Sequence, residues 1–246
     1  MLPATSSEVV MSQSPADPTR PIDETVVGFT PPPAPGDDAV IEGRTVRLER
    51  LNAARHAADI HAAAHGADWI WDYLGYGPFR SEAEYRAWME GVEAGRDPCF
   101  YAFVDKASGR ALGLGSLMRV DVPNGVIEVG HIMITPAMQR TTAASEAIML
   151  MVGWAFRNGY RRVEWKCDAL NAPSRAAADR YGFSPEGVFR QHMIIKGRNR
   201  DTAWFAMTDR DWPAIRARWD AWLAPSNFDA EGRQREPLMG RDRQAG

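Results

Sequence analysis

The sequence has few cysteines and no excess of one charge. Cys99 and Cys167 are the only cysteines among 246 residues, too few for a disulfide framework and without the spacing of a metal site. We expect two buried, reduced thiols in a cytoplasmic protein that holds no metal. A catalytic cysteine is the alternative, but no His or Asn pattern frames either one. The net charge of −3 supplies no global basic field, so nucleic-acid binding is not expected.

Signals for export and for membranes are also lacking. The first residues contain no basic stretch followed by an apolar stretch, so we expect no signal peptide. The longest apolar run, 147–156, is interrupted by Gly153 and has about half the length of a bilayer span. This run predicts a buried helix, and no membrane partner is expected.

The composition predicts one folded domain between two polar flanks. Residues 1–40 are rich in Pro, Ser, Thr and Asp, and such a segment buries too little apolar surface to offset its chain entropy. We expect a disordered or loosely docked extension, with a partner-binding Pro-rich segment as the alternative. Residues 41–224 form the expected domain, and 225–246 are expected to be a polar C-terminal tail.

Alternation, turn residues and capping residues predict a mixed domain. Strands are expected at 45–48, 99–105, 111–120, 126–134, 162–167, 188–195 and 201–207, and helices at 52–65, 81–88, 143–157, 174–181 and 211–222. Asn52 and Ser81 are expected helix caps. The strand-helix-strand run from 126 to 167 predicts two parallel strands. The expected fold is therefore α/β of the α+β type, with a mostly antiparallel sheet of about seven strands and helices on both faces.

The turn before the expected helix 143–157 is a candidate anion site. A helix N-terminus presents free backbone N–H groups and the positive end of the helix dipole, which suits a phosphate. In the turn 139–144, Arg140 adds a positive charge, and Thr141 and Thr142 add hydroxyl groups. An ordinary helix start capped by threonine is the alternative.

The order of elements and several local motifs resemble the GNAT superfamily of N-acetyltransferases, in particular its RimJ/RimL-like branch. The motifs that carry the resemblance are Glu128-Val129-Gly130-His131, Ser145-Glu146-Ala147, Asn171-Ala172-Pro173-Ser174, Tyr181-Gly182-Phe183, Glu186-Gly187, Arg190, Gly197-Arg198 and Arg200-Asp201. The resemblance spans about residues 43–223. Gln139 and Ala144 match the ends of the pyrophosphate-binding turn of that family, whereas Thr142 stands where the family has glycine.

The resemblance implies a site for acetyl-CoA as co-substrate. The residues implied to bind it are Ile132, Met133, Ile134, Gln139, Arg140, Thr141, Thr142, Ala143, Ala144, Asn171 and Ser174. Asn171 is implied to bond the pantetheine arm and Ser174 to act as the acid or thiol contact, because Ala178 occupies the family's tyrosine position. Helix capping by both residues is the alternative.

Glu128 and His131 are the candidate bases. They lie three residues apart on one expected strand, so in a regular strand they face opposite sides. A β-bulge would change this, and the gap that substrates need between strands makes one plausible. Histidine titrates near neutral pH, whereas Glu128 matches the acidic position of the family. A cross-strand ion pair for Glu128 and a packed role for His131 are the alternatives.

The function expected from these features is transfer of an acetyl group from acetyl-CoA to a primary amine. The RimJ/RimL resemblance suggests a protein N-terminus as acceptor, and a small amine or antibiotic is the alternative acceptor. A non-catalytic CoA-binding module is the alternative function, motivated by Thr142 and Ala178. A homodimer is expected from the family alone.

Overall fold

The computed structural model describes residues 23–238. The chain divides into two units, Met1–Thr30 and Pro31–Gly246, and the second contains every helix and strand of the described residues. Its strands are β1 Val40–Glu42, β2 Val46–Arg50, β3 Cys99–Asp105, β4 Ala111–Asp121, β5 Val126–Ile134, β6 Arg162–Asp168, β7 Ser184–Ile195 and β8 Arg198–Thr208. Its helices are α1 Ala53–Ala64, α2 Glu82–Val92, α3 Thr142–Arg157, α4 Ala172–Tyr181 and α5 Trp212–Leu223, with short 3₁₀ turns at Asp68–Trp71, Val122–Asn124 and Pro225–Asn227.

The strands form one sheet in the order β1-β2-β3-β4-β5-β6-β8-β7. Every neighbouring pair is antiparallel except β5 and β6, which are parallel, as the crossover through α3 predicts. The expected fold class is confirmed, but the sheet has eight strands where about seven were expected. The additional strand, β1, has three residues, of which only Ile41 is buried, and so short a segment carries too little alternation to be recognised.

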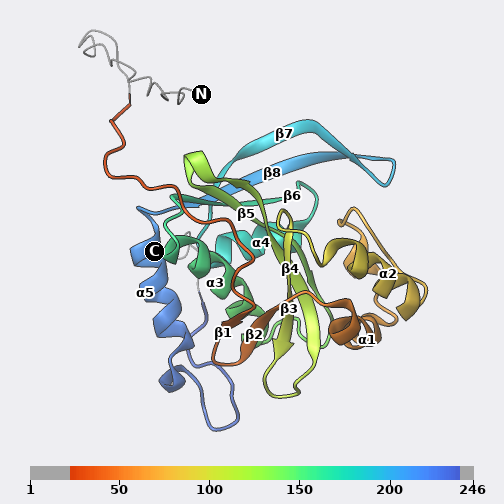
Figure 1. The fold of residues 1–246 in the computed structure, drawn as a ribbon. Helices are drawn as coiled ribbons and strands as arrows, with labels where there is room; N and C mark the ends of the chain where they lie inside the picture. Colours follow the sequence, from red (N-terminus) through yellow and green to blue (C-terminus); the bar gives the residue numbers. More distant parts are fainter. Residues whose placement is uncertain (1–22, 239–246) are drawn as a thin grey trace, which may run out of the picture. The chain divides into compact units, whose positions relative to one another are not determined.

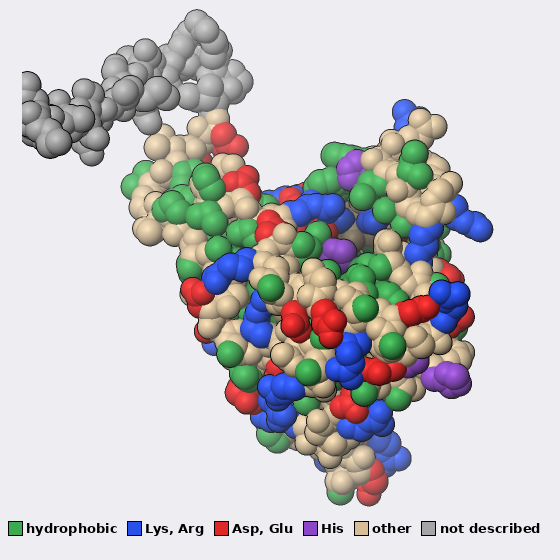
Figure 2. All heavy atoms as spheres, turned by 45° about the vertical axis from the view of Figure 1, so that its right-hand side comes forward, with side chains coloured by type: hydrophobic (Ala, Val, Ile, Leu, Met, Phe, Trp, Pro, Cys, Tyr) green, Lys and Arg blue, Asp and Glu red, His purple; other side chains and the backbone are tan. Residues whose placement is uncertain are grey.

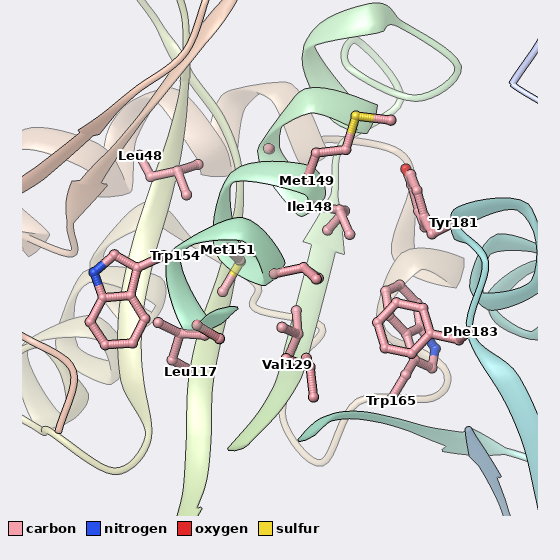
Figure 3. Close-up of a cluster of buried hydrophobic side chains, with 14 of the residues drawn as sticks. Leu48, Leu117, Val129, Ile148, Met149, Met151, Trp154, Trp165, Tyr181 and Phe183 are labelled. Carbon is pink, nitrogen blue, oxygen red and sulfur yellow. The ribbon is translucent and has the colours of Figure 1, made fainter. Parts of the chain in front are cut away.

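The helices lie on both faces of the sheet (Figure 1). On one face, α3 and α5 pack on the sheet through a core that includes Leu117, Val129 and Ile148. Figure 3 shows these side chains turned toward one another between α3 and the strands. On the other face, α1 and α2 form a second core with β3 and β4, centred on Ile60, Tyr85 and Leu114. Fully buried apolar side chains contribute about 1.5–3 kcal/mol each, so both layers hold the sheet.

The helix starts follow the capping residues. The Asn52 side chain accepts a hydrogen bond from the N–H of Arg55, and Ser81 accepts one from Glu84. Each cap satisfies one of the backbone donors that a helix start leaves free. Within the described part of the chain, none of the helices combines the length and apolarity needed to cross a bilayer.

Both flanks of the expected domain contribute side chains or backbone to the second unit. Tyr160 donates a hydrogen bond from its hydroxyl to the carbonyl of Pro33, and Trp154 donates one from its indole to Asp38. Leu238, near the other end, is buried in the core beside α3 and α5. The expected boundaries at 41 and 224 stay predictions, and most of the 1–40 extension lies outside the described residues.

Candidate active site

Strands β5 and β6 separate partway along the sheet. They pair only from Val126 with Arg162 to Glu128 with Glu164. Beyond that point β5 continues against β4 to Ile134, and β6 continues against β8 to Asp168. The edge of β5 that faces β6 is therefore unpaired after Glu128, and its backbone N–H and C=O groups are available to a ligand.

A bulge in β5 lies at the start of this unpaired edge. Ser116 of β4 pairs with Gly130, and Leu114 pairs with Met133, so His131 and Ile132 together oppose one residue of β4. His131 has a positive φ of 51°, which is unusual for a residue other than glycine. The expected bulge is confirmed. It turns His131 toward the α1/α2 face, where the regular alternation of β5 also places Glu128.

His131 forms one wall of an aromatic pocket with a volume of about 240 Å³. Its ring centroid lies 5.6 Å from that of Tyr76 and 5.1 Å from that of Phe100, and Tyr76 stacks on Trp88 at 4.2 Å. We name this the aromatic pocket, lined by Tyr76, Trp88, Gly91, Val92, Gly95, Pro98, Phe100 and His131. Figure 2 shows hydrophobic side chains, basic side chains and histidines around a hollow in the upper part of this face.

The surroundings of His131 keep its imidazole neutral. Burial disfavours the charged ring, and the nearby positive charges of Arg119 and Arg200 act in the same direction, so the pKa of His131 falls to about 4. At neutral pH the ring therefore has one nitrogen free to accept a hydrogen bond.

Glu128 is held in an ion network. Its carboxylate lies 2.8 Å from Nη1 of Arg119 and 3.1 Å from Nζ of Lys166. Lys166 also contacts Glu164 at 2.6 Å and lies 3.9 Å from the centre of the Trp204 ring. The side chains of Glu128 and Lys166 are each only 5% exposed. This is the cross-strand ion pairing that the sequence left open as an alternative for Glu128.

The turn before α3 is braced by its own side chains. Gln139 donates from its side-chain amide to the carbonyl of Ile134 at 3.0 Å, and Thr141 caps the helix by accepting from the N–H of Ala144 at 3.2 Å. Arg140 takes the left-handed conformation with φ 62°, whereas Thr142 is the first helical residue. In a helix the first N–H groups have no internal acceptor, so those of Thr142 and Ala143 are free for an anion.

The three residues expected along the pantetheine arm divide between the two faces. Met133 is 1% exposed and packs in the core beneath α1 and α2. Ile132 and Ile134 are partly buried on the α3 face. Only their side chains, together with the β5 backbone, are open toward the gap on the α3 side, because the Met133 side chain is enclosed.

Asn171 and Ser174 lie at the start of α4. The Asn171 side chain accepts a hydrogen bond from the N–H of Ser174 at 3.1 Å, which is the capping role left open as an alternative. The Ser174 hydroxyl accepts one from the indole of Trp165 at 3.0 Å. The Ser174 side chain also interacts with the Cys167 thiol, and this hydrogen bond opposes the rise that burial causes in the pKa of Cys167. Ala178, in the expected tyrosine position, is fully buried.

The structure adds residues that the sequence did not single out. Tyr76, Trp88 and Phe100 form the aromatic pocket with His131. Arg200 lies near His131 but was noted only as part of a family motif. The sequence did not indicate these residues because they are far from His131 along the chain, and α2, β3 and β8 meet His131 only after folding. Among the described residues, no group of three or more His, Cys, Asp or Glu is arranged to hold a metal ion.

Known proteins resemble this chain in sequence and fold. Residues 45–184 match the acetyltransferase (GNAT) domain family. A crystal structure of a GCN5-related N-acetyltransferase from Brucella melitensis is 46% identical, covering 87% of this chain and 97% of that one, with a TM-score of 0.83. An uncharacterized N-acetyltransferase p20 from Bacillus licheniformis is 25% identical over 113 residues, 46% of this chain, and the match spans 63% of that relative.

The likeness to the RimL group is more distant. The ribosomal L7/L12 alpha-N-protein acetyltransferase RimL shares 22% identity, with 69% of this chain and 93% of that chain covered, at a TM-score of 0.59. That likeness shows the fold alone, so the RimJ/RimL branch is not confirmed. The family match over residues 45–184 and the 46% identity to the Brucella melitensis structure, in contrast, show the family, and the chain belongs to the GNAT acetyltransferase family.

Proposed function

We propose that this protein transfers an acetyl group from acetyl-CoA to a primary amine. The observation that carries the proposal is the separation of β5 and β6 beyond Glu128, beside a helix start with free N–H groups. The separation leaves room and backbone hydrogen-bonding groups for an extended ligand, and the helix start suits a phosphate group.

Several residues would hold acetyl-CoA. The free N–H groups of Thr142 and Ala143 suit a pyrophosphate, and the exposed Arg140 adds charge. Ala143 and Ala144 are small and buried, so they leave the helix start open to close approach. The full set in the proposal is Gln139, Arg140, Thr141, Thr142, Ala143 and Ala144 for the phosphates, and Ile132, Met133, Ile134, Asn171 and Ser174 for the arm.

The transfer needs few chemical groups from the protein. Bound acetyl-CoA supplies a thioester carbonyl. The amine nitrogen forms a bond to the carbonyl carbon and loses a proton, the carbon–sulfur bond breaks, and the sulfur leaves as a thiolate that takes up a proton. An N–H group on the unpaired edge of β5 stabilises the negative charge that develops on the carbonyl oxygen.

We favour His131 over Glu128 as the group that meets the amine. The Glu128 carboxylate is already engaged by Arg119 and Lys166, whereas the neutral His131 ring faces the aromatic pocket. A pKa of about 4 makes His131 a weak base. The amine nitrogen becomes a much stronger acid once it has bonded to the carbonyl carbon, so a weak base suffices at that stage.

Ser174 is the proposed donor to the departing sulfur. Its hydroxyl accepts from Trp165 and interacts with the Cys167 thiol, so its hydrogen would turn from that thiol to the departing sulfur. A thiol has an ordinary pKa near 8.5, so the thiolate leaves with little help, and a hydrogen bond from serine is sufficient.

The acceptor class and setting are part of the proposal. A protein N-terminus, as in the RimJ/RimL-like branch, and a small amine or antibiotic are the two acceptor classes considered. The free, buried Cys99 and Cys167 support a reducing, cytoplasmic setting. A homodimer is carried over from the family alone. The competing function is a CoA-binding module without catalysis, motivated by Ala178 in place of a tyrosine.

Thiol release in the presence of acetyl-CoA and a panel of amines tests the proposal. We expect release that depends on both substrates, together with a mass increase on the amine. Binding of acetyl-CoA without release for any amine would favour the non-catalytic module. Failure of acetyl-CoA to protect the helix start in hydrogen exchange would contradict the proposed cofactor site.

A further inference from the structure

Arg200 is a cation without a partner among the residues that the structure describes. It lies on β8, and its Nε atom is buried without a hydrogen-bond acceptor. Among residues 23–238, no hydrogen bond or ion pair engages any other nitrogen of its guanidinium group. Leaving a buried donor unsatisfied costs about 1–3 kcal/mol, and more for a charged group, so an unpaired arginine requires an explanation.

Arg200 lies at the mouth of the gap between β5 and β6. The pairing of β8 with β6 ends at Thr202 and Asp168, and Arg200 is two residues farther along, on the same face as Thr202. Its charge lowers the pKa of His131, and it opposes the rise that burial causes in the pKa of Cys167. Arg200 is therefore within electrostatic reach of both sides of the gap.

The other cations near Glu128 are compensated. Arg119 is paired with Glu128, and Lys166 with Glu128 and Glu164. Arg162 contacts Glu164 and Glu186. These three cations and three carboxylates balance one another, so none of these carboxylates is left over for Arg200.

Asp201 does not neutralise Arg200 either. Adjacent residues of a strand point to opposite faces, and the Asp201 carboxylate accepts hydrogen bonds from the N–H of Gln191 and the side chain of Asn199. The charge of Arg200 thus acts on His131 without a hydrogen bond or ion pair from the described chain.

The chemistry of the missing partner follows from the guanidinium group. Its planar fork matches a carboxylate with two parallel hydrogen bonds. The aromatic pocket on the other side of His131 has no acidic residue in its lining, so it offers no ion pair to a second amino group of a polyamine. It offers rings and apolar surface instead.

We propose that Arg200 binds a carboxylate of the amine acceptor, and that the acceptors are amino acids or peptides whose carboxylate lies close to the reacting amine, with an apolar side chain in the aromatic pocket. The proposal rests on the proposed acetyl transfer and names its substrate class. Arg200 is then a specificity-determining residue that orients the amine beside His131.

Pairs of acids and amides test this proposal. The probes are L-phenylalanine and L-leucine, their carboxamides, and the dipeptide Phe-Ala with its amide, compared at equal concentrations of free amine. A hydrogen bond to a charged group contributes about 1.5–3 kcal/mol, so we expect wild-type kcat/KM to favour the acids by roughly 10- to 100-fold. The amino-acid and dipeptide arms separate a free amino acid from a peptide as the source of the carboxylate.

The variants Arg200→Gln and Arg200→Lys show whether the preference depends on this side chain. We expect Arg200→Gln to remove the preference by raising KM for the acids far more than KM for the amides, while KM for acetyl-CoA stays unchanged. Arg200→Lys should restore part of the preference, because it keeps the charge and loses the fork. Arg198→Gln is the matched control, since Arg198 is an exposed arginine two residues away on the same strand.

Other results would overturn the inference. Equal rates for acids and amides in the wild type would do so, as would an effect of Arg200→Gln confined to acetyl-CoA. Calorimetric binding of L-phenylalanine to the protein with CoA is a readout independent of turnover. We expect the affinity for L-phenylalanine to fall by roughly tenfold or more in Arg200→Gln. Suppose that no amine is acetylated, but the wild type binds L-phenylalanine and Arg200→Gln does not. The proposed function then fails, and the carboxylate site stands.

Discussion

The two sides of the gap between β5 and β6 are built from different materials. On the α3 side, the candidate site consists of backbone N–H groups and small residues, held by the cap of Thr141 and the side chain of Gln139. On the α1/α2 side, it consists of rings and charged groups, with His131 between the aromatic pocket and Arg200. The first side suits the proposed cofactor, acetyl-CoA, which is the same for every acceptor. The second side suits the proposed amine acceptor, which differs from one enzyme to another.

Substitutions are expected to act differently on the two sides. A backbone donor survives most changes of its own side chain, so Thr142 can stand where the family has glycine. A side-chain wall changes with each replacement, so we expect specificity to depend on the α1/α2 side, where we propose that the acceptor binds.

The largest effect is expected from a negative charge on the backbone-built side. Thr142→Asp places a carboxylate in the first turn of α3, and two like charges about 4 Å apart repel by about 4 kcal/mol at an effective dielectric constant near 20. We expect acetyl-CoA binding to weaken by roughly 100-fold or more in calorimetry. The melting temperature should not fall, because an acid favours a helix start.

Thr142→Gly is the control for this first prediction. Replacing threonine by the family's glycine leaves the N–H donor in place, so the affinity should change by less than about threefold. A large gain in affinity for Thr142→Gly would show that the threonine side chain crowds the site and would contradict the contrast.

The next largest effect is expected on the stability of the folded protein when Glu128 of β5 is replaced. Glu128→Gln removes one member of a buried ion network, which costs about 3 kcal/mol and lowers the melting temperature by roughly 6–12 °C. We expect kcat/KM at a permissive temperature to stay within about tenfold of the wild type. A loss of turnover without a loss of stability would instead identify Glu128 as the base.

His131→Gln should show the opposite pattern. Removing a group that accepts a proton lowers rates by roughly 100-fold or more, so we expect kcat/KM to fall by about that factor. Thermal unfolding should change little, because glutamine remains partly exposed at this bulge. Comparing Glu128→Gln with His131→Gln separates a stabilising role from a catalytic one. Wild-type turnover in His131→Gln would exclude the proposed role of His131.

The smallest effect is a dependence of stability on pH. The unfolded chain binds a proton at histidine near pH 6.5, whereas the pKa of His131 in the folded protein is about 4. Between these values the unfolded state binds more protons, so stability is lost as pH falls. We expect His131 to account for about 2 kcal/mol of the loss from pH 7 to pH 5.

Chemical unfolding of the wild type and His131→Gln at both pH values measures this term. The pKa of His56 is also lowered by burial, and its contribution remains in both proteins and cancels in the difference. Equal losses in the two proteins would mean that His131 titrates normally in the folded state.

Local patterns predicted much of the fold because they depend on neighbours in the chain. The bounds of β3 and β5, and the caps at Asn52 and Ser81, follow from alternation and turn chemistry. Strand β1 was missed because three residues carry no reliable period. The candidate site was only half predictable, since the turn before α3 is a local structure, whereas the aromatic pocket joins α2, β3 and β5.

The sequence by itself determined the order of elements, the parallel crossover through α3 and the donor-rich helix start, because each depends on residues close together in the chain. The difference between Glu128 and His131, in contrast, arises from tertiary contacts. The bulge opposite Gly115 turns His131 to the face on which Glu128 already lies. Residues from distant strands then pair with Glu128 and keep His131 neutral. The charge of Arg200, unpaired among the described residues, has the same origin, because folding and not sequence proximity decides which side chains can form an ion pair with it.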